Sequence, residues 1–197
     1  MDKNLKLQLP EVTLICLTNK DFLGHKKALD KSCEGIEFGA VKLIWDEKCT
    51  SIDEWNRRII QDLYKYVDTT HAMLIHADGY VINPELWNPD WMSLDYIGAP
   101  WPLPTDDYSY RSESGKIQRV GNSVSLRSKA LMQRVALFDW RPYFGNTNED
   151  GFISVHFRDR LEAEGFKFAS LEQAVRFSKE HEIPENKGLS MFAFHSL

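Results

Sequence analysis

The chain has 197 residues, of which 43% are hydrophobic and 27% are charged, and its formal net charge is −5. These values are typical of a soluble globular protein, and we expect residues 1–197 to form a single domain with a core from about residue 12 to residue 195. The basic residues form no cluster. Nucleic acid is therefore excluded as an expected partner, because phosphate neutralisation dominates that affinity.

The amino-terminal stretch "MDKNLKLQLPEVTLICL" contains only a short apolar run, which follows Pro10 and Glu11. It predicts neither a signal peptide nor a transmembrane helix, so we expect at most peripheral association with a membrane. The cysteines are odd in number and lack metal-binding spacing: Cys16, Cys33 and Cys49. We interpret them as reduced thiols of a cytoplasmic protein, at most one that works at the inner face of the membrane.

Strands and helices alternate in the first half of the chain. Continuous, β-branched apolar runs predict buried strands at residues 12–17, 40–45 and 72–77. Helices are predicted between them, at residues 25–33 and 51–67. Ser51 suits the N-cap of the second helix, and Glu54 would complete a capping box. This order predicts an α/β fold with a mainly parallel sheet, in which ligands gather at the carboxyl ends of the strands.

The second half is less regular. A short strand within "LDYIGAPWPLP" is expected to run into a proline-rich turn, and residues 105–119 look like a long loop. "VGNSVSLRSKALMQRV" predicts a brief strand followed by a helix from about Ser128. Residues 148–164 are expected to form a helix with Asn148 as its N-cap, and residues 166–169 a strand.

The stretch "AMLIHADGYVINP", residues 72–84, ends an apolar strand in His76, Ala77, Asp78 and Gly79. An aspartate there is well placed to hold a metal that bridges a diphosphate. The alternative is that Asp78 and Gly79 only form a turn, or that Asp78 caps a neighbouring group. A haloacid-dehalogenase-type phosphatase motif is excluded, because His76 stands where the nucleophilic aspartate would be and no aspartyl-phosphate can form.

Two acidic residues, Glu149 and Asp150, open the predicted helix at 148–164. Acids are favoured there by the helix dipole, so they are either ordinary helix-start residues or a general base that accepts a proton from a hydroxyl. The dipole lowers the pKa of a carboxyl group and weakens it as a base. A neighbouring acid or partial burial would offset this effect.

Other candidate site residues are weaker when taken alone. His195 closes the aromatic run "FAFHSL"; it is either structural or a ligand for a Mn²⁺-type ion, and His76 either binds a ligand or lines the cleft. Trp101 offers a flat face to a sugar ring. Gly121 permits close backbone approach, and Asn122 can both donate and accept.

Taken in order, these motifs resemble a bacterial glycosyltransferase-like family whose founding domain was catalogued as of unknown function and which often accompanies surface-polysaccharide genes. The resemblance runs from about Val12 to His195. The segments that carry it are "LIHADGYVINPELW", "LDYIGAPWPLP", "RVGNSVSLRSKAL", "NEDGFIS", "FKFASLEQAVRFSKE" and "FAFHS". That family is in turn similar to GT-A-type nucleotide-sugar transferases, notably galactosyltransferases.

The resemblance implies a GT-A-like (Rossmann-like) α/β/α sandwich and roles for particular residues. Asp78 matches the last aspartate of the D-x-D metal motif, and His195 matches a late metal ligand. Glu149 and Asp150 match an acidic pair that includes the base. The chain departs from the pattern twice: His76 replaces the first aspartate of D-x-D, and the segment near residue 50 is shorter than usual.

The resemblance therefore implies transfer of a sugar from a nucleoside-diphosphate sugar to a hydroxyl of a glycan or lipid-linked acceptor, in surface polysaccharide biosynthesis. Inversion of configuration is expected from the single displacement that such a base would assist. Asp150 is the expected base, with Glu149 holding acceptor hydroxyls. Asp78 and His195 would hold a divalent cation, Mn²⁺ or Mg²⁺. His76, Gly79, Trp101, Gly121 and Asn122 would line the donor and acceptor sites. The alternatives are a non-catalytic sugar- or nucleotide-binding module derived from this fold and a phosphohydrolase.

Overall fold

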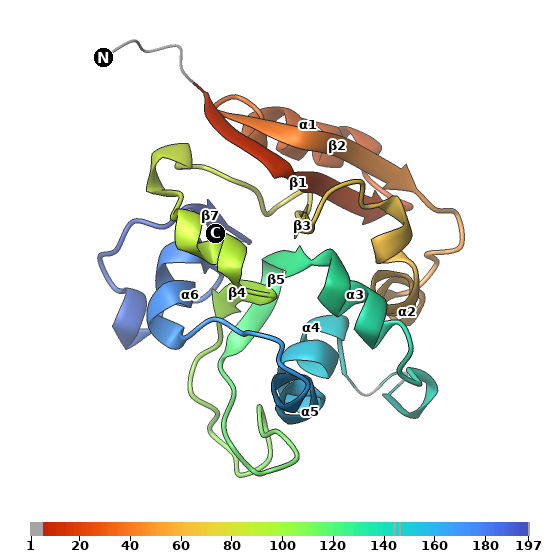
Figure 1. Ribbon diagram of the computed structural model, residues 1–197, viewed down its shortest axis with the longest axis vertical. Helices are drawn as coiled ribbons and strands as arrows, with labels where there is room; N and C mark the ends of the chain where they lie inside the picture. The colour runs from red at the N-terminus through yellow and green to blue at the C-terminus, as the bar shows by residue number, and fades with distance from the viewer. Residues whose placement is uncertain (1–5, 144, 146, 197) are drawn as a thin grey trace.

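The structure is a computed structural model, and it describes residues 6–143, 145 and 147–196, without the side chains of residues 122 and 123. Its centre is a five-stranded sheet with the strand order β2-β1-β3-β5-β4. The strands are β1 (Leu7–Thr18), β2 (Ile36–Trp45), β3 (His71–Leu74), β4 (Tyr96–Pro100) and β5 (Val120–Ser128). Helices lie around this sheet, which gives an α/β fold (Figure 1).

The sheet is mixed, so the expectation of a mainly parallel sheet is not confirmed. β1 pairs in parallel with β2 and β3, whereas β5 pairs antiparallel with both β3 and β4. The physical reason lies in the connection between β4 and β5. A parallel pair needs a crossover, usually helical, but residues 101–119 contain no helix and return the chain directly beside the strand it has just left.

Most helices are short. The α-helices are α1 (Phe22–Ser32), α2 (Ile52–Gln61), α3 (Lys129–Val135), α4 (Glu149–Gly151), α5 (Arg158–Ala163) and α6 (Leu171–Phe177). Single 3₁₀ turns occur at Leu63–Tyr66, Pro84–Leu86, Pro89–Ser93, Arg141–Tyr143 and Pro184–Asn186, and a π-helix occupies Phe152–His156. A small second sheet pairs β6 (Ser178–Lys179) with β7 (Ala193–Phe194). None of the helices in the described ranges is long and apolar enough to cross a membrane.

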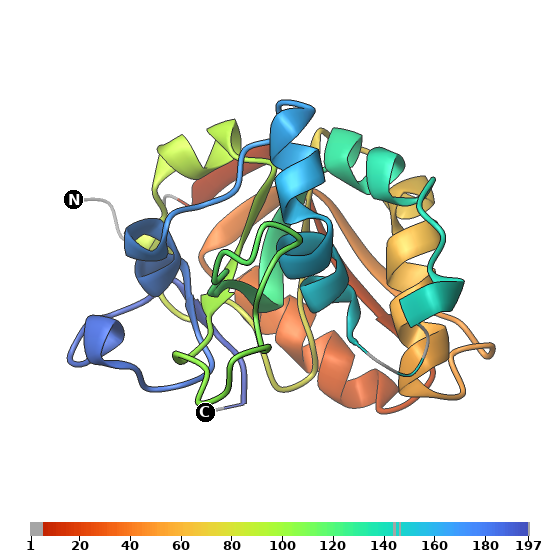
Figure 2. The same cartoon turned by 90° about the horizontal axis from the view of Figure 1, so that it is seen from below.

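Strand β1 is buried on both of its faces. Leu14 packs in a cluster with Leu29 of α1, whereas its neighbour Ile15 packs with Ile59 of α2. Successive side chains of a strand point to opposite faces, so this alternation places α1 and α2 on opposite sides of the sheet (Figure 2). The continuous apolar run in the sequence reflects this two-sided burial.

Several predicted elements are shorter or broken in the structure. Helix 51–67 ends at Gln61, and the 3₁₀ turn Leu63–Tyr66 completes it. Helix 148–164 is divided into α4, the π-helix and α5, and the strand expected at 166–169 is reduced to one bridge between Tyr96 and Phe168. Isolated π turns occur frequently at functional sites, so the break after α4 points to the acidic pair.

The two predicted helix caps differ in outcome. Ser51 is confirmed, because its Oγ accepts a hydrogen bond from the backbone N of Glu54 (3.2 Å), although the Glu54 carboxylate pairs with Arg57 and completes no capping box. Asn148 precedes α4 but makes no capping hydrogen bond. Its Oδ1 accepts instead from Nδ2 of Asn56 (3.2 Å), a contact between α2 and α4 that local sequence does not predict.

Candidate active site

A cavity of about 700 Å³ opens beside the ends of β1 and β3. Its wall comes from segments far apart in sequence: residues 17–21 and His25, residues 49–52 with Trp55 and Asn56, residues 76–78, residues 148–150, Glu180 and His195. Volumes of this size hold drug-sized ligands and cofactors. The cavity therefore lies where the α/β pattern of the sequence places a ligand.

Asp78 projects into the cavity from a tight turn that follows β3. The backbone N of His76 donates to the carbonyl of Gly79 (2.8 Å), so Ala77 and Asp78 form the tip of the turn. The Asp78 side chain is 65% exposed, and one of its oxygens accepts from Oγ of Ser196 (3.0 Å). The turn interpretation and the ligand interpretation are therefore compatible, because the turn is what presents the carboxylate.

Gly79 allows the carboxyl-terminal strand to approach this turn. A Cβ atom at Gly79 would lie 2.7 Å from Cδ2 of His195 and 3.0 Å from a methyl group of Val124. β7 runs beside the turn, and the backbone N of Ser196 donates to the carbonyl of Asp78 (2.9 Å). A larger residue at position 79 would push the imidazole away from Asp78.

His195 lies between two carboxylates. Its Nε2 is 3.4 Å from Asp78, and its Nδ1 is 3.3 Å from Glu180. Burial by itself would lower the pKa of His195, but the carboxylates of Glu180 and Asp78 outweigh burial and raise it. The same pairing lowers the pKa of Asp78 despite the partial burial of that group. This part of the cavity thus favours an imidazolium next to a carboxylate.

His76 is held in a row of aromatic rings. Its ring centroid lies 5.6 Å from that of Trp55 and 5.1 Å from that of His195, and its Nε2 is buried without a hydrogen-bond partner. Burial and the neighbouring His195 lower the pKa of His76 to about 3. The ring is therefore neutral near pH 7, so His76 does not supply the negative charge of the aspartate that it replaces in the D-x-D pattern.

Asp150 faces the same cavity from the start of α4. Burial and the adjacent Glu149 raise its pKa to about 7, although the backbone N of Gly151 donates to it (2.7 Å) and Arg127 acts in the opposite direction. The weakening effect of the helix start is thus outweighed by burial and a neighbouring acid. A carboxyl group with a pKa near the working pH is suited to accept a proton.

Glu149 also touches the cavity, but its carboxylate is engaged. Its two oxygens accept from the guanidinium of Arg127, at 2.6 and 3.0 Å, and the two side chains are only 3% and 1% exposed. Its backbone N donates to Oδ1 of the fully buried Asn56 (3.1 Å). Strand β5 and helix α2 therefore both hold this residue.

Trp101 and Gly121 are not among the residues that line the cavity. Trp101 is 7% exposed and stacks almost parallel on Tyr110, with ring centroids 5.0 Å apart. Gly121 lies against Trp101 and Ser154, since a Cβ atom there would be 2.9 Å from the Trp101 ring and 2.0 Å from Oγ of Ser154. The side chain of Asn122 lies outside the described part of the structure.

The sequence prediction missed Arg127, Glu180 and Trp55. Arg127 is a single cation inside the apolar strand "VSLRS", and such a residue signals a buried ion pair. Trp55 belongs to the apolar face of α2, and the indole N that donates to the carbonyl of Leu17 (2.8 Å) becomes apparent only from the fold. Glu180 carries no local signal, because the pairing of β6 with β7 brings it to His195.

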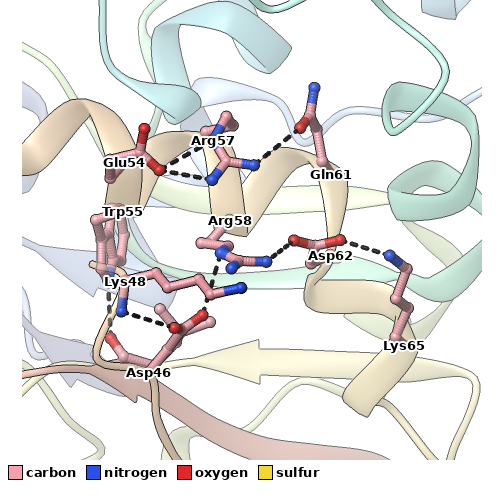
Figure 3. A network of polar contacts seen from close by, with 10 residues as sticks. Asp46, Lys48, Glu54, Trp55, Arg57, Arg58, Gln61, Asp62 and Lys65 are labelled. Atoms are coloured by element: carbon pink, nitrogen blue, oxygen red, sulfur yellow. Dashed lines mark hydrogen bonds and ion pairs between the residues drawn. The ribbon is translucent and has the colours of Figure 1, made fainter. Parts of the chain in front are cut away.

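Residues 49–51 form one wall of the cavity, and the turn that leads to them from Asp46 is held to α2 by a polar network (Figure 3). Asp46 pairs with Nε of Arg58 (3.1 Å) and accepts from the backbone N of Lys48 (2.9 Å). Arg58 also pairs with Asp62. The short segment near residue 50 is thus an ordered turn.

Asp78 and His195 provide two donors for a cation, and no group of three or more His, Cys, Asp or Glu side chains suited to a metal occurs among the residues the structure describes. Two protein donors fit a cation whose other ligands are substrate phosphates and water, as is usual for Mg²⁺. They do not form a closed protein site.

Comparison with known proteins gives a family and a fold. A family model described as "Protein of unknown function (DUF5672)" matches residues 40–195. No curated protein sequence matches the chain. A solved structure described as a glycosyltransferase involved in the glycosylation of the major capsid of PBCV-1 is similar to it, with a TM-score of 0.60 and 12% sequence identity, over 94% of this chain and 92% of that one. At this identity the likeness concerns the fold.

Proposed function

The chain belongs to the family described as "Protein of unknown function (DUF5672)", and we propose that it is a glycosyltransferase that moves a sugar from a nucleoside-diphosphate sugar to a hydroxyl of a glycan or lipid-linked acceptor. One observation carries the proposal. In a fold similar to that of a glycosyltransferase, Asp150, Asp78 and His195 line one cavity, and the pKa of Asp150 is raised to about 7.

The proposed reaction is a single displacement with inversion at the anomeric carbon. The acceptor oxygen bonds to that carbon, the bond from the carbon to the diphosphate oxygen breaks, and Asp150 takes the proton of the acceptor hydroxyl. The transition state resembles an oxocarbenium ion, which calls for a base on one side and charge neutralisation on the other. Asp150 supplies the base, and His195 supplies the positive charge that faces the diphosphate.

The diphosphate is proposed to lie beside His195 and Asp78, with His76 forming the floor of its site and Gly79 packed behind the His195 ring. A divalent cation, Mn²⁺ or Mg²⁺, held by Asp78 and by His195 in its neutral form would take the place of the imidazolium and neutralise charge on the departing diphosphate. Gly121 adjoins Asp150 through Ser154, whose Oγ donates to the carbonyl of Asp150 (2.6 Å), and Trp101 lies against Gly121. We place the acceptor on this side, and surface polysaccharide biosynthesis in the cytoplasm is the proposed setting.

The test combines binding and turnover. UDP-, GDP-, CMP- and dTDP-sugars, each with and without Mn²⁺, are screened by thermal shift, and the best donor is assayed for release of its nucleotide with simple glycosides as acceptors. Asp150→Asn should lower turnover by about 10²- to 10⁴-fold and keep the donor's thermal shift, because loss of a positioned base affects the chemical step. Unchanged turnover in Asp150→Asn would refute the assignment.

The second candidate is a nucleotide-sugar-binding protein without turnover. Two features favour it. His76 stands in place of the first acid of the D-x-D motif, and Asp78 and His195 offer a cation only two protein donors. This candidate predicts the same thermal shifts for the native protein and for Asp150→Asn, and no release of nucleotide from either. A phosphohydrolase would instead release phosphate without any acceptor.

A further inference from the structure

The ion pair between Arg127 and Glu149 is costly to bury. Both side chains lie in the interior, and the guanidinium also donates from Nε to Oγ of Ser125 (2.8 Å) and lies over the ring of Tyr96, 5.1 Å from its centroid. A buried ion pair is often no more stabilising than two well-packed apolar side chains of similar size. Its presence calls for a role other than stability.

The ion pair contacts the first turn of an interrupted helix. α4 comprises only Glu149–Gly151 and changes at Phe152 into a π-helix. As the first turn of a helix, residues 149–151 have no preceding turn to bond, and the hydrogen-bond pattern of the helix changes immediately after them. Contacts from other elements therefore help to set the direction of its side chains: Arg127 holds the Glu149 carboxylate, and Asn56 holds the Glu149 backbone.

We propose that Arg127 is a positioning residue, which acts through Glu149 to fix the direction in which Asp150 enters the cavity. Glu149 is then part of this support and not a ligand of the acceptor. The inference rests on the proposed function for the chemistry of Asp150, but the arrangement of the pair stands on its own. Six charged or titratable groups surround Asp150, namely Glu149, Arg127, Glu180, His195, Tyr96 and Tyr110.

The test replaces both partners together, because removal of one partner leaves a buried charge. Arg127→Met with Glu149→Leu keeps the volume apolar and should hold the unfolding temperature near that of the native protein. The exposed pair Arg134–Glu164, also 2.6 Å apart, is the matched control and receives the same two replacements. Two readouts follow: the titration of the Asp150 carboxyl by ¹³C NMR, and kcat and KM for the best donor of the panel.

We expect the double variant at residues 127 and 149 to shift the Asp150 titration and to lower kcat by about 10²-fold with little change in KM for the donor, since small misplacements near the chemistry have effects of this size. The control should change neither. A folded double variant with the native titration and kcat would overturn the inference and leave the pair a purely structural feature.

Conservative variants keep the test decisive if the double variant does not fold. Glu149→Gln should lower the pKa of Asp150, because the nearest negative charge is lost and Arg127 is freed to pair with Asp150. Arg127→Lys keeps the positive charge but loses the bidentate contact with the Glu149 carboxylate. The pKa of Asp150 in this variant should lie between its values in the native protein and in the double variant. Native titration in both variants would also overturn the inference. If the native protein turns over no nucleotide sugar, the proposed function fails, yet the NMR titration still decides the role of Arg127.

Discussion

At the scale of single residues, two aspartates of one cavity have opposite properties. Asp78 is exposed beside an imidazole and has a lowered pKa, whereas Asp150 is half-buried beside another acid and has a pKa raised to about 7. Pairs of like groups whose surroundings separate their pKa values in this way are a general mark of acid–base chemistry. The residue type is the same, so the surroundings determine the roles.

The raised pKa of Asp150 has a consequence for stability. Between an unfolded value near 3.8 and the folded value of about 7, the native protein keeps a proton that the unfolded chain releases. The stability contributed by this group is therefore present at low pH and lost as the pH rises toward 7. We expect Asp150→Asn to raise the melting temperature at pH 8 by several degrees and to have little effect at pH 4, as measured by thermal unfolding.

The matched variant is Asp78→Asn, for which the pH dependence of the change in stability has the opposite sign. Asp78 has a lowered pKa, so its contribution is present at neutral pH and lost in acid. This substitution should lower the melting temperature at pH 7, and its effect should shrink as the pH falls through the lowered pKa of Asp78. Equal behaviour of the two variants across this range would contradict the assigned surroundings.

At the scale of elements, the turn between β2 and α2 links the packing of these two elements to the cavity. Asp46 bonds both to Arg58 of α2 and to the backbone of the turn, and Cys49, Thr50 and Ser51 beyond it line the cavity (Figure 3). Local sequence predicts the helix through its apolar period and Ser51. It does not predict the pairing of Asp46 with Arg58, which depends on how β2 and α2 lie relative to each other.

Asp46→Ala should loosen this turn. We expect a loss of about 1–3 kcal/mol in the free energy of unfolding, since the charged partner Arg58 loses one of its acceptors, together with a weaker thermal shift from the best nucleotide sugar. Chemical denaturation measures the first effect. Lys65→Ala, which removes an exposed member of the same network, should change stability by less than about 0.5 kcal/mol and leave the ligand shift intact.

At the scale of the whole molecule, the carboxyl-terminal segment completes the site. Phe192 is fully buried against Trp91 and Phe177, and the backbone of residues 192–196 bonds to residues 78–83. This packing brings His195 to Asp78 across more than a hundred residues of sequence. The segment thus serves both the core and the cavity.

Two truncations separate these roles. A chain that ends at Phe194 should keep nearly the native melting temperature but lose the shift caused by the nucleotide sugar, because His195 is gone. A chain that ends at Met191 also loses Phe192, and burial of a ring of this size is worth about 3–5 kcal/mol, so we expect it to unfold at a much lower temperature. A native ligand shift in the first truncation would place the ligand away from His195.

The sequence by itself determined the alternation of strands and helices in the first half, the Ser51 cap, and the presence of polar residues where β3 ends. These features depend on local periodicity and on hydrogen bonds between near neighbours. The reversal of β5, the division of the helix after Gly151 and the contacts of Arg127, Glu180 and His195 were decided by the tertiary structure. The reason is that burial and charge pairing depend on which distant segments pack together, and a local pattern in one chain does not contain that information.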